Sequence, residues 1–196
     1  MNIQNLKVIK NSEINDKLLN DVLNFDRTIF KTDEDYSFPD GYLEKMYETN
    51  KEGLFVLLDG DNVVGYANCI FLTDKIKEEY LKTKDYLLLE NKGFQVGDNN
   101  MYFYTLALQE KYRDIGAVNI LMQQFSAWLN IERQKGKTIS SCISEAITTD
   151  GIKTLRAMGM LPQDVDENGL GIYYSPDCLN SYISKMIEKS RDDEER

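Results

Sequence analysis

Residues 102–122 read YFYTLALQEKYRDIGAVNILM, and this stretch decides the fold of the chain. Residues 102–108 are uncharged and mostly aromatic or aliphatic, which is typical of a buried strand. Further along, apolar side chains recur at helical spacing, so we expect a long helix that ends near Gly136. Its apolar positions are Val118, Leu121, Met122, Phe125, Trp128 and Leu129. The chain therefore passes from a strand into a helix through one short turn.

The turn over residues 109–117 is suited to binding an anion. Gly116 can adopt a backbone conformation that other residues avoid. The first N–H groups of a helix have no partner within the helix, and the helix dipole adds partial positive charge there. A phosphate or pyrophosphate fits such a site. On this pattern alone, an ordinary strand–turn–helix with a glycine in the turn remains the alternative.

The turn and its flanks resemble the acyl-CoA signature of the GNAT superfamily of N-acyltransferases. The matching residues are Leu106, Ala107, Leu108, Tyr112, Arg113 and Gly116, with Leu121 and Met122 at the places of two leucines in the helix. Glu110 replaces the usual proline, and Val118 replaces a glycine or alanine where backbone and pyrophosphate come close. Met158-Gly159-Met160 stands where the family ends a later helix with Leu-Gly-Phe. The resemblance covers about residues 50–160.

The resemblance implies an α/β fold with a GNAT-like mixed central sheet flanked by helices. We expect strands at 3–9, 54–58, 63–72, 102–108, 138–144 and 170–174, and helices at 12–29, 41–50, 74–90, 117–135, 149–159 and 176–189. Ser12 is placed to cap the first helix, and Thr149 or Asp150 the helix that Gly159 ends. Residues 32–39 read as a loop. Residues 1–190 are expected to form a single domain, followed by a charged tail at 191–196.

Residues 74–100 separate the third and fourth strands, which the family often joins by a tight turn. We expect a helix over 74–90 and a flexible loop over 91–100. This insertion is either a substrate-binding lid, or a contact for a partner or a merely tolerated insertion, and the sequence leaves these alternatives open. The helix at 176–189 lies beyond the usual family core. It is expected to pack on the domain or on a second subunit, so a homodimer is among the expected assemblies.

The composition limits the partners and the compartment. The net charge is −10, from 33 acidic and 23 basic residues, which disfavours nucleic acid and suits a cationic amine, although acidity also serves solubility. No apolar run approaches the roughly 20 residues that span a bilayer, and the N-terminus lacks the apolar core of a signal peptide. The scattered cysteines Cys69, Cys142 and Cys178 indicate buried thiols in a reducing cytoplasm.

The chain contains no histidine, which excludes Ser-His-Asp and Cys-His catalysis. The cysteines lack C-x-x-C spacing, so we expect no metal site. Any proton transfer must use carboxylate, tyrosine, cysteine, lysine or water.

The resemblance implies that an acceptor amine attacks the thioester of acetyl-CoA directly. The main chain of Leu106, Ala107 and Leu108 would contact the pantetheine arm, and the N–H of Leu108 would stabilise the developing oxyanion. The backbone groups expected to hold the pyrophosphate belong to Arg113, Asp114, Ile115, Gly116, Ala117 and Val118.

The side chains that GNAT enzymes use to move protons are largely missing. The family's glutamate on the fourth strand is replaced at the same-face positions by Tyr102 and Tyr104, and its thiolate-protonating tyrosine by Leu155. Glu145 is the nearest carboxylate for a base, and Tyr104 and Tyr173 are candidate hydroxyls, with Tyr174 beside the latter. Solvation of the glutamate and aromatic packing of the tyrosines are the alternative interpretations.

The sequence therefore predicts an acetyl-CoA-dependent N-acetyltransferase. A GNAT-shaped module that holds CoA and regulates a partner is the main alternative, and a plain interaction domain is the third. The acceptor stays open among small amines, polyamines, aminoglycosides, amino-acid derivatives and protein amino groups.

Overall fold

The computed structural model describes residues 5–10, 13–30, 41–49 and 51–176, and its strands form one seven-stranded mixed sheet. The strand order is β1-β2-β3-β4-β5-β7-β6. The strands are β1 Leu6–Lys10, β2 Leu54–Asp59, β3 Asn62–Leu72, β4 Gly97–Leu108, β5 Lys137–Ala146, β6 Leu161–Val165 and β7 Gly171–Ser175. β4 runs parallel to β5, whereas β2 pairs antiparallel with β1 and β3, and β7 with β5 and β6. The mixed sheet confirms the predicted fold class.

Helices flank this sheet, as the sequence predicts. They are α1 Asp16–Ile29, α2 Tyr42–Thr49, α3 Asp74–Thr83, α4 Glu110–Arg113, α5 Ala117–Gln134 and α6 Thr149–Ala157, with short 3₁₀ turns η4 Lys51–Gly53 and η5 Tyr86–Leu88. The chain divides into two compact units, one of residues 1–68 and 105–124, the other of 69–104 and 125–196. The expectation of a single domain over 1–190 stays a prediction.

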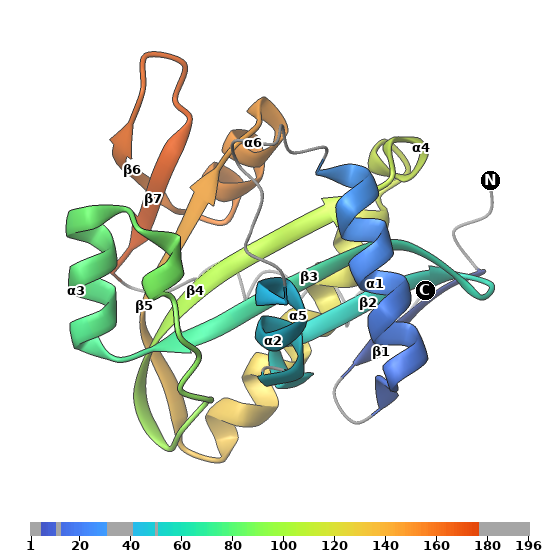
Figure 1. Ribbon diagram of the computed structural model, residues 1–196, viewed down its shortest axis with the longest axis horizontal. Helices are drawn as coiled ribbons and strands as arrows, with labels where there is room; N and C mark the ends of the chain where they lie inside the picture. Colours follow the sequence, from blue (N-terminus) through green and yellow to red (C-terminus); the bar gives the residue numbers. More distant parts are fainter. Residues whose placement is uncertain (1–4, 11–12, 31–40, 50, 177–196) are drawn as a thin grey trace, which may run out of the picture. The chain divides into compact units, whose positions relative to one another are not determined.

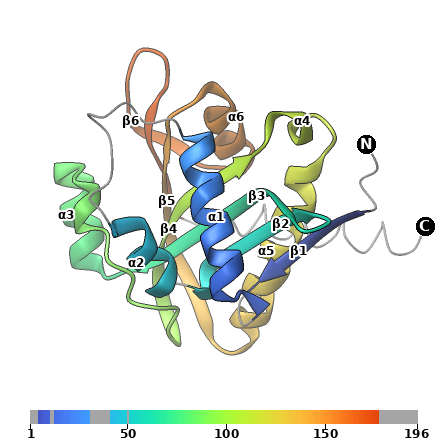
Figure 2. The same ribbon diagram turned by 45° about the vertical axis from the view of Figure 1, so that its right-hand side comes forward.

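In the first unit, α1 and α2 cover one face of β1, β2 and β3 (Figures 1 and 2). The side chain of Asn15 accepts a hydrogen bond from the N–H of Leu18 and so caps α1. The core beneath the helix contains Val22 and Leu23 from α1 and Tyr66 from β3. The apolar stripe of α1 thus positions the helix as its spacing predicts.

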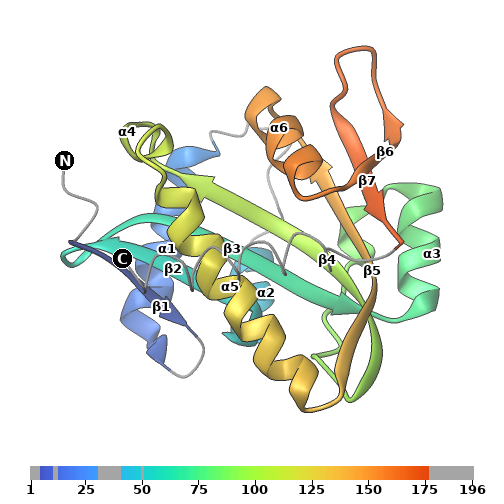
Figure 3. The same ribbon diagram turned by 180° about the vertical axis from the view of Figure 1, so that it is seen from behind.

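In the second unit, the later turns of α5 pack on β3 and β4 through aromatic rings. The ring centroids of Phe125 and Phe103 lie 5.5 Å apart, and those of Trp128 and Phe71 lie 6.3 Å apart. Figure 3 shows this part of α5 crossing the strands. Gly136, with φ +83°, follows the end of α5, where the sequence predicts it.

β4 begins at Gly97, so the expected loop over 91–100 is wrong in its last four residues. The side-chain amide of Asn99 donates to the carbonyl oxygens of Gln95, Gly97 and Thr138 at 2.8–3.0 Å. These bonds satisfy a buried amide, which lets a polar residue occupy a strand. The polar composition alone had suggested a loop.

The helix expected over 74–90 is shorter. α3 ends at Thr83 because Lys84 takes a left-handed conformation with φ 61°. Thr148, rather than either predicted residue, caps α6 by accepting from the N–H of Gly151.

The sequence reading missed β6 altogether. Its side chains are mostly exposed and it contains Pro162, so it lacks the apolar alternation of a buried strand. As the last strand of the sheet, β6 tolerates a proline, which lacks the N–H that a central strand needs.

Some predictions fall outside the described residues. These are the cap at Ser12, the loop at 32–39, Cys178, nearly all of the helix at 176–189 and the tail. Cys69 and Cys142 are buried, as predicted. Within the described ranges, no helix is both long and apolar enough to cross a membrane.

Candidate active site

Among the described residues, the second half of β4 lacks a partner on its β5 side, although β4 is a central strand of the sheet. Its pairing with β5 covers Gly97–Tyr102, although β4 itself continues to Leu108. Tyr104, Thr105 and Leu106 are only half-buried, whereas the residues on both sides of them are buried. An extended molecule can therefore approach the strand along this stretch.

Of the main-chain groups predicted to bind pantetheine, those of Leu106 and Leu108 point away from β3, whereas those of Ala107 point toward β3, contrary to the prediction for that residue. The N–H of Gln109 donates to the carbonyl of Val64 in β3 at 2.9 Å. Because successive residues of a strand direct their main-chain groups to opposite edges, Leu108 and, two residues earlier, Leu106 direct theirs to the other edge. At that edge Nε of Arg113 donates to the carbonyl of Leu108 at 3.2 Å.

The turn after β4 has the predicted strand–glycine–helix form. Gly116 has φ +80°, and α5 begins at the next residue, Ala117. A Cβ on Gly116 would meet only the side chain of Asn119, at 3.5 Å, so the backbone conformation rather than space requires glycine here. Ala117 is fully buried, and Val118 is half-buried.

Tyr112 anchors this turn to β2. Its ring is buried, and its hydroxyl donates to Oδ2 of Asp59 at 2.7 Å. Burial, together with this hydrogen bond and the charge of Asp59, raises the pKa of Tyr112 to about 12. The signature tyrosine thus fixes α4 against the end of β2.

Gly65 in β3 allows β4 to lie close, a role that sequence reasoning missed. A Cβ at this position would lie 2.4 Å from Cδ2 of Leu108 and 2.7 Å from the carbonyl oxygen of Ala107. Any larger residue would push against the strand that carries the candidate site. The available signal was a lone glycine inside an apolar strand.

Glu145 is exposed and contacts a small group of tyrosines. The hydroxyl of Tyr80 in α3 donates to Oε2 of Glu145 at 3.4 Å, and the hydroxyl oxygens of Tyr80 and Tyr102 are 3.0 Å apart. Burial raises the pKa of Tyr102 well above its usual value, and Tyr80, Glu145 and Tyr104 add to the rise. Tyr80 was not among the candidate site residues predicted from the sequence.

The structure does not bring Tyr173 together with Glu145. The strand register pairs Tyr173 with Ser144, and Glu145 with Ile172, so the two side chains lie on opposite faces. The hydroxyl of Tyr173 donates to the carbonyl of Gly169 at 3.0 Å. It closes the β6–β7 turn.

The other two tyrosines lie nearer to the Glu145 group. The ring centroid of Tyr104 lies 5.8 Å from that of Tyr102. Tyr174, which pairs with Ile143, shares the face of Glu145.

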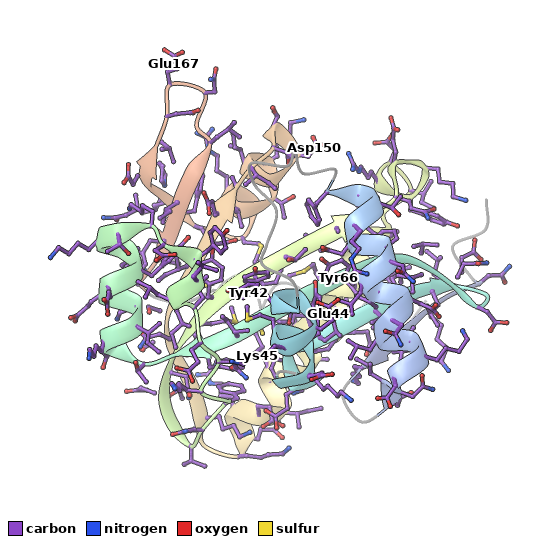
Figure 4. The ribbon with its side chains drawn as sticks, viewed as in Figure 1. Tyr42, Glu44, Lys45, Tyr66, Asp150 and Glu167 are labelled. Atoms are coloured by element: carbon purple, nitrogen blue, oxygen red, sulfur yellow. The ribbon has the colours of Figure 1, made fainter. Side chains whose placement is uncertain are left out.

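A second polar network lies under α1 and α2 of the first unit. Tyr66 donates to Oδ1 of the buried Asp26, and Tyr47 donates to the hydroxyl of Tyr66 at 2.8 Å. Figure 4 shows Tyr66 directed from β3 toward the two helices. Burial raises the pKa of Asp26, partly offset by the hydrogen bond from Tyr66. These residues were not predicted as polar partners.

Comparison with known proteins agrees with this geometry. A family model described as the acetyltransferase (GNAT) family matches residues 19–153. The chain belongs to the GNAT family. No curated protein matches it by sequence.

Several solved GNAT structures share the fold at low sequence identity. Naa50 of Arabidopsis thaliana, in complex with the bisubstrate analogue CoA-Ac-MVNAL, has a TM-score of 0.57 at 15% identity over 87% of this chain and 98% of its own. Arylalkylamine N-acetyltransferase 2 of Aedes aegypti has 0.57 at 14% over 88% and 99%. NAA60 of A. thaliana, in complex with acetyl-CoA, has 0.55 at 13% over 86% and 96%.

One departure from the GNAT pattern, Leu155 in place of a tyrosine, lies inside the second unit. Leu155 is buried in α6, and the N–H of Met160 donates to its carbonyl at 3.0 Å. This GNAT chain therefore carries an aliphatic side chain where the family's resemblance implies a tyrosine acid.

Proposed function

We propose that this GNAT chain is an acetyl-CoA-dependent N-acetyltransferase that passes an acetyl group to an amine. One continuous segment of the chain carries the proposal. The stretch of β4 that lacks a β5 partner leads through the left-handed Gly116 into the first turn of α5. An extended CoA arm can lie along a strand that lacks a partner, and its pyrophosphate can bind at the start of a helix.

The residues present suit CoA as a substrate. The main chain of Leu106 and Leu108 would hold pantetheine, and the backbone over 113–118 would hold pyrophosphate. Gly116 carries no side chain, and the methyl group of Ala117 is buried, so neither obstructs the start of α5. The half-buried side chain of Val118 would leave the pyrophosphate less room at the start of α5, but it does not remove the helix dipole. The complexes of NAA60 with acetyl-CoA and of Naa50 with a CoA analogue support this assignment.

The reaction proceeds by direct attack. The amine nitrogen forms a bond to the thioester carbonyl carbon, the C–S bond breaks, and CoA leaves as a thiolate that takes up a proton. The N–H of Leu108, or that of Leu106 at the same edge, stabilises the oxyanion that develops on the acetyl carbonyl. Either role uses the backbone, so the side-chain departures do not remove it.

The acceptor is proposed to be a cationic amine. The net charge of −10 attracts cations, and the exposed Glu145 supplies a local carboxylate. The solved relatives include an arylalkylamine N-acetyltransferase, an aminoglycoside acetyltransferase and an agmatine N-acetyltransferase, which act on amines by name.

Calorimetry with acetyl-CoA tests the cofactor directly, and we expect binding in the micromolar range. Thiol release is then followed with spermidine, tryptamine, agmatine, kanamycin and a peptide with a free N-terminus. Turnover above background with at least one amine supports the enzyme. Binding without turnover would favour a CoA-holding regulatory module, which the buried Leu155, the tyrosines in place of a β4 glutamate and Val118 also suit. No binding by folded protein at millimolar acetyl-CoA would overturn both.

A further inference from the structure

A chain of hydroxyl groups joins β4 to an exposed carboxylate within the second unit. It begins at Tyr102 on β4, passes through Tyr80 on α3 and ends at Glu145 on β5, with oxygen–oxygen distances of 3.0 Å and 3.4 Å. Tyr102 and Tyr80 are 4% and 1% exposed, whereas Glu145 is exposed to solvent. The chain therefore runs from the interior to water.

The hydrogen bonds of this chain can all point toward the carboxylate. A hydroxyl group carries a single proton to donate and accepts through its oxygen. Because Tyr80 donates its proton to Glu145, the bond between the two tyrosines must use the proton of Tyr102. In this arrangement the oxygen of Tyr102 keeps acceptor capacity, so a proton taken up there can be passed toward the carboxylate.

The insertion helix is fixed so that Tyr80 stays in this chain. At the start of α3, Oδ1 of Asp74 accepts from the side-chain amide of Asn100 at 2.9 Å. At its end, Nζ of Lys84 lies 2.8 Å from Oδ2 of Asp164 on β6. The rings of Tyr80 and Tyr102 meet edge to face with centroids 5.2 Å apart.

We propose that Tyr80 is a positioning residue for proton removal, linking Tyr102 to Glu145 as a relay. This proposal rests on the proposed acetyl transfer. The ammonium group of the acceptor passes a proton to the oxygen of Tyr102, whose own proton moves to Tyr80, whose proton moves to Glu145. The net change is an ammonium and a carboxylate becoming an amine and a carboxylic acid, while both tyrosines end neutral. Glu145 then returns the proton to water.

This relay would replace the general base that the chain otherwise lacks. There is no histidine, and Tyr102, four residues before Leu106, occupies one of the β4 positions where the family resemblance implies a glutamate. Burial raises the pKa of Tyr102 well above its usual value, with Tyr80 contributing next. A buried tyrosine of this kind stays neutral and does not store a negative charge.

Several titratable groups lie on the elements that carry the relay or pair with those elements. They are Asp74, Lys77 and Lys84 on or at the end of α3, Tyr104 on β4, Tyr174 on β7 and Asp164 on β6. The two lysines are ion-paired with the two aspartates, and this pairing holds while both partners stay charged.

The test compares Tyr80→Phe, Glu145→Gln and the double variant with the wild type, using an amine that the wild type acetylates. Tyr86→Phe, a tyrosine of the same insertion, is the control. We expect each relay variant to lower kcat roughly 100-fold at pH 7, with unchanged KM for acetyl-CoA. The acidic limb of the pH–rate profile moves to higher pH, so the rate recovers in alkali. The double variant falls no further than the single ones.

A merely structural tyrosine would give another result. It would lower Tm while leaving the pH profile in place, and its effect would add to that of Glu145→Gln. An unchanged pH profile, additive effects of the two substitutions, or full activity of Tyr80→Phe when the wild type is active would each overturn the relay alone. A wild type that transfers no acetyl group overturns the proposed function and the relay together. Glu145 is exposed, so its variant will fold even if Tyr80→Phe does not.

Discussion

Asp26 is a carboxylate with only 7% of its surface exposed, held by the hydroxyl of Tyr66. Burial raises its pKa above 3.8 in the folded protein. The folded state therefore binds a proton more tightly than the unfolded state does. The contribution of this group to stability is complete below about pH 3.8 and is lost as the pH rises through the folded-state pKa.

Asp26→Asn should therefore raise Tm at pH 7 by a few degrees, because the amide is uncharged and its oxygen still accepts from Tyr66. The advantage should shrink at pH 4. Thermal melts at both pH values measure it. Asp21→Asn on the same helix, an exposed partner of Lys17, is the control and should change stability by less than about 0.5 kcal/mol. A destabilised Asp26→Asn at pH 7 would contradict this account.

Tyr112 offers a second test at the level of one hydroxyl. Tyr112→Phe removes the 2.7 Å bond to Asp59 and should lower the free energy of unfolding by about 1–2 kcal/mol. The pKa of Tyr112 is raised from 10 to about 12, so the hydroxyl stabilises the fold below pH 10 and loses that effect as the pH rises through 12. Urea unfolding at pH 7 measures the loss. Equal stabilities would show that Tyr112 does not anchor the turn.

At the scale of one element, the junction between β4 and α5 depends on the left-handed Gly116. Gly116→Ala forces a side chain into φ +80° and should cost about 1 kcal/mol of stability. The adjustment would move the first turn of α5, so we expect acetyl-CoA affinity to fall at least tenfold by calorimetry. Gly159→Ala, at the same φ of +80° after α6, is the matched control. Equal affinity losses in both would exclude a local role for Gly116.

The middle of α5 carries a different kind of defect. Ser126 is fully buried, and its hydroxyl has no hydrogen-bond partner among the described residues. Ser126→Ala removes an unsatisfied polar group and improves helix propensity, so stability should rise by about 1 kcal/mol. Urea unfolding tests this. A loss of stability would show that the hydroxyl is hydrogen-bonded in solution.

For the whole molecule, acetyl-CoA should stabilise the fold by binding the native state alone. At a ligand concentration of about 100 Kd, the gain is about 2.7 kcal/mol, seen as a rise in Tm. NAD at the same concentration shares the adenine and pyrophosphate but lacks pantetheine, so its shift should be smaller. Equal rises in Tm with acetyl-CoA and NAD would show that the adenine nucleotide, rather than pantetheine along β4, supplies the binding energy.

Local patterns were sufficient to predict much of this molecule. The β2–β3 hairpin, the passage from β4 through Gly116 into α5, and α6 were all expected from the sequence. Each depends on residues close together in the chain, through alternation, helical spacing and glycine conformation. The strand start at Gly97 escaped prediction because bonds to distant residues stabilise it. β6 escaped prediction because its side chains are mostly exposed and it contains Pro162, so it lacks the pattern of a buried strand.

The candidate site divides in the same way. The backbone groups around Leu108 and Gly116 were predicted from the quoted stretch and its resemblance to the GNAT signature, and their roles stay predictions. That stretch determined the strand, the turn and the helix start, because neighbouring residues set backbone direction. Only the tertiary structure revealed Gly65 beneath β4, turned Tyr173 away from Glu145, and joined Tyr80 to Tyr102 and Glu145. Hydrogen bonds between residues 22 to 65 positions apart arise from folding, and no local pattern encodes them.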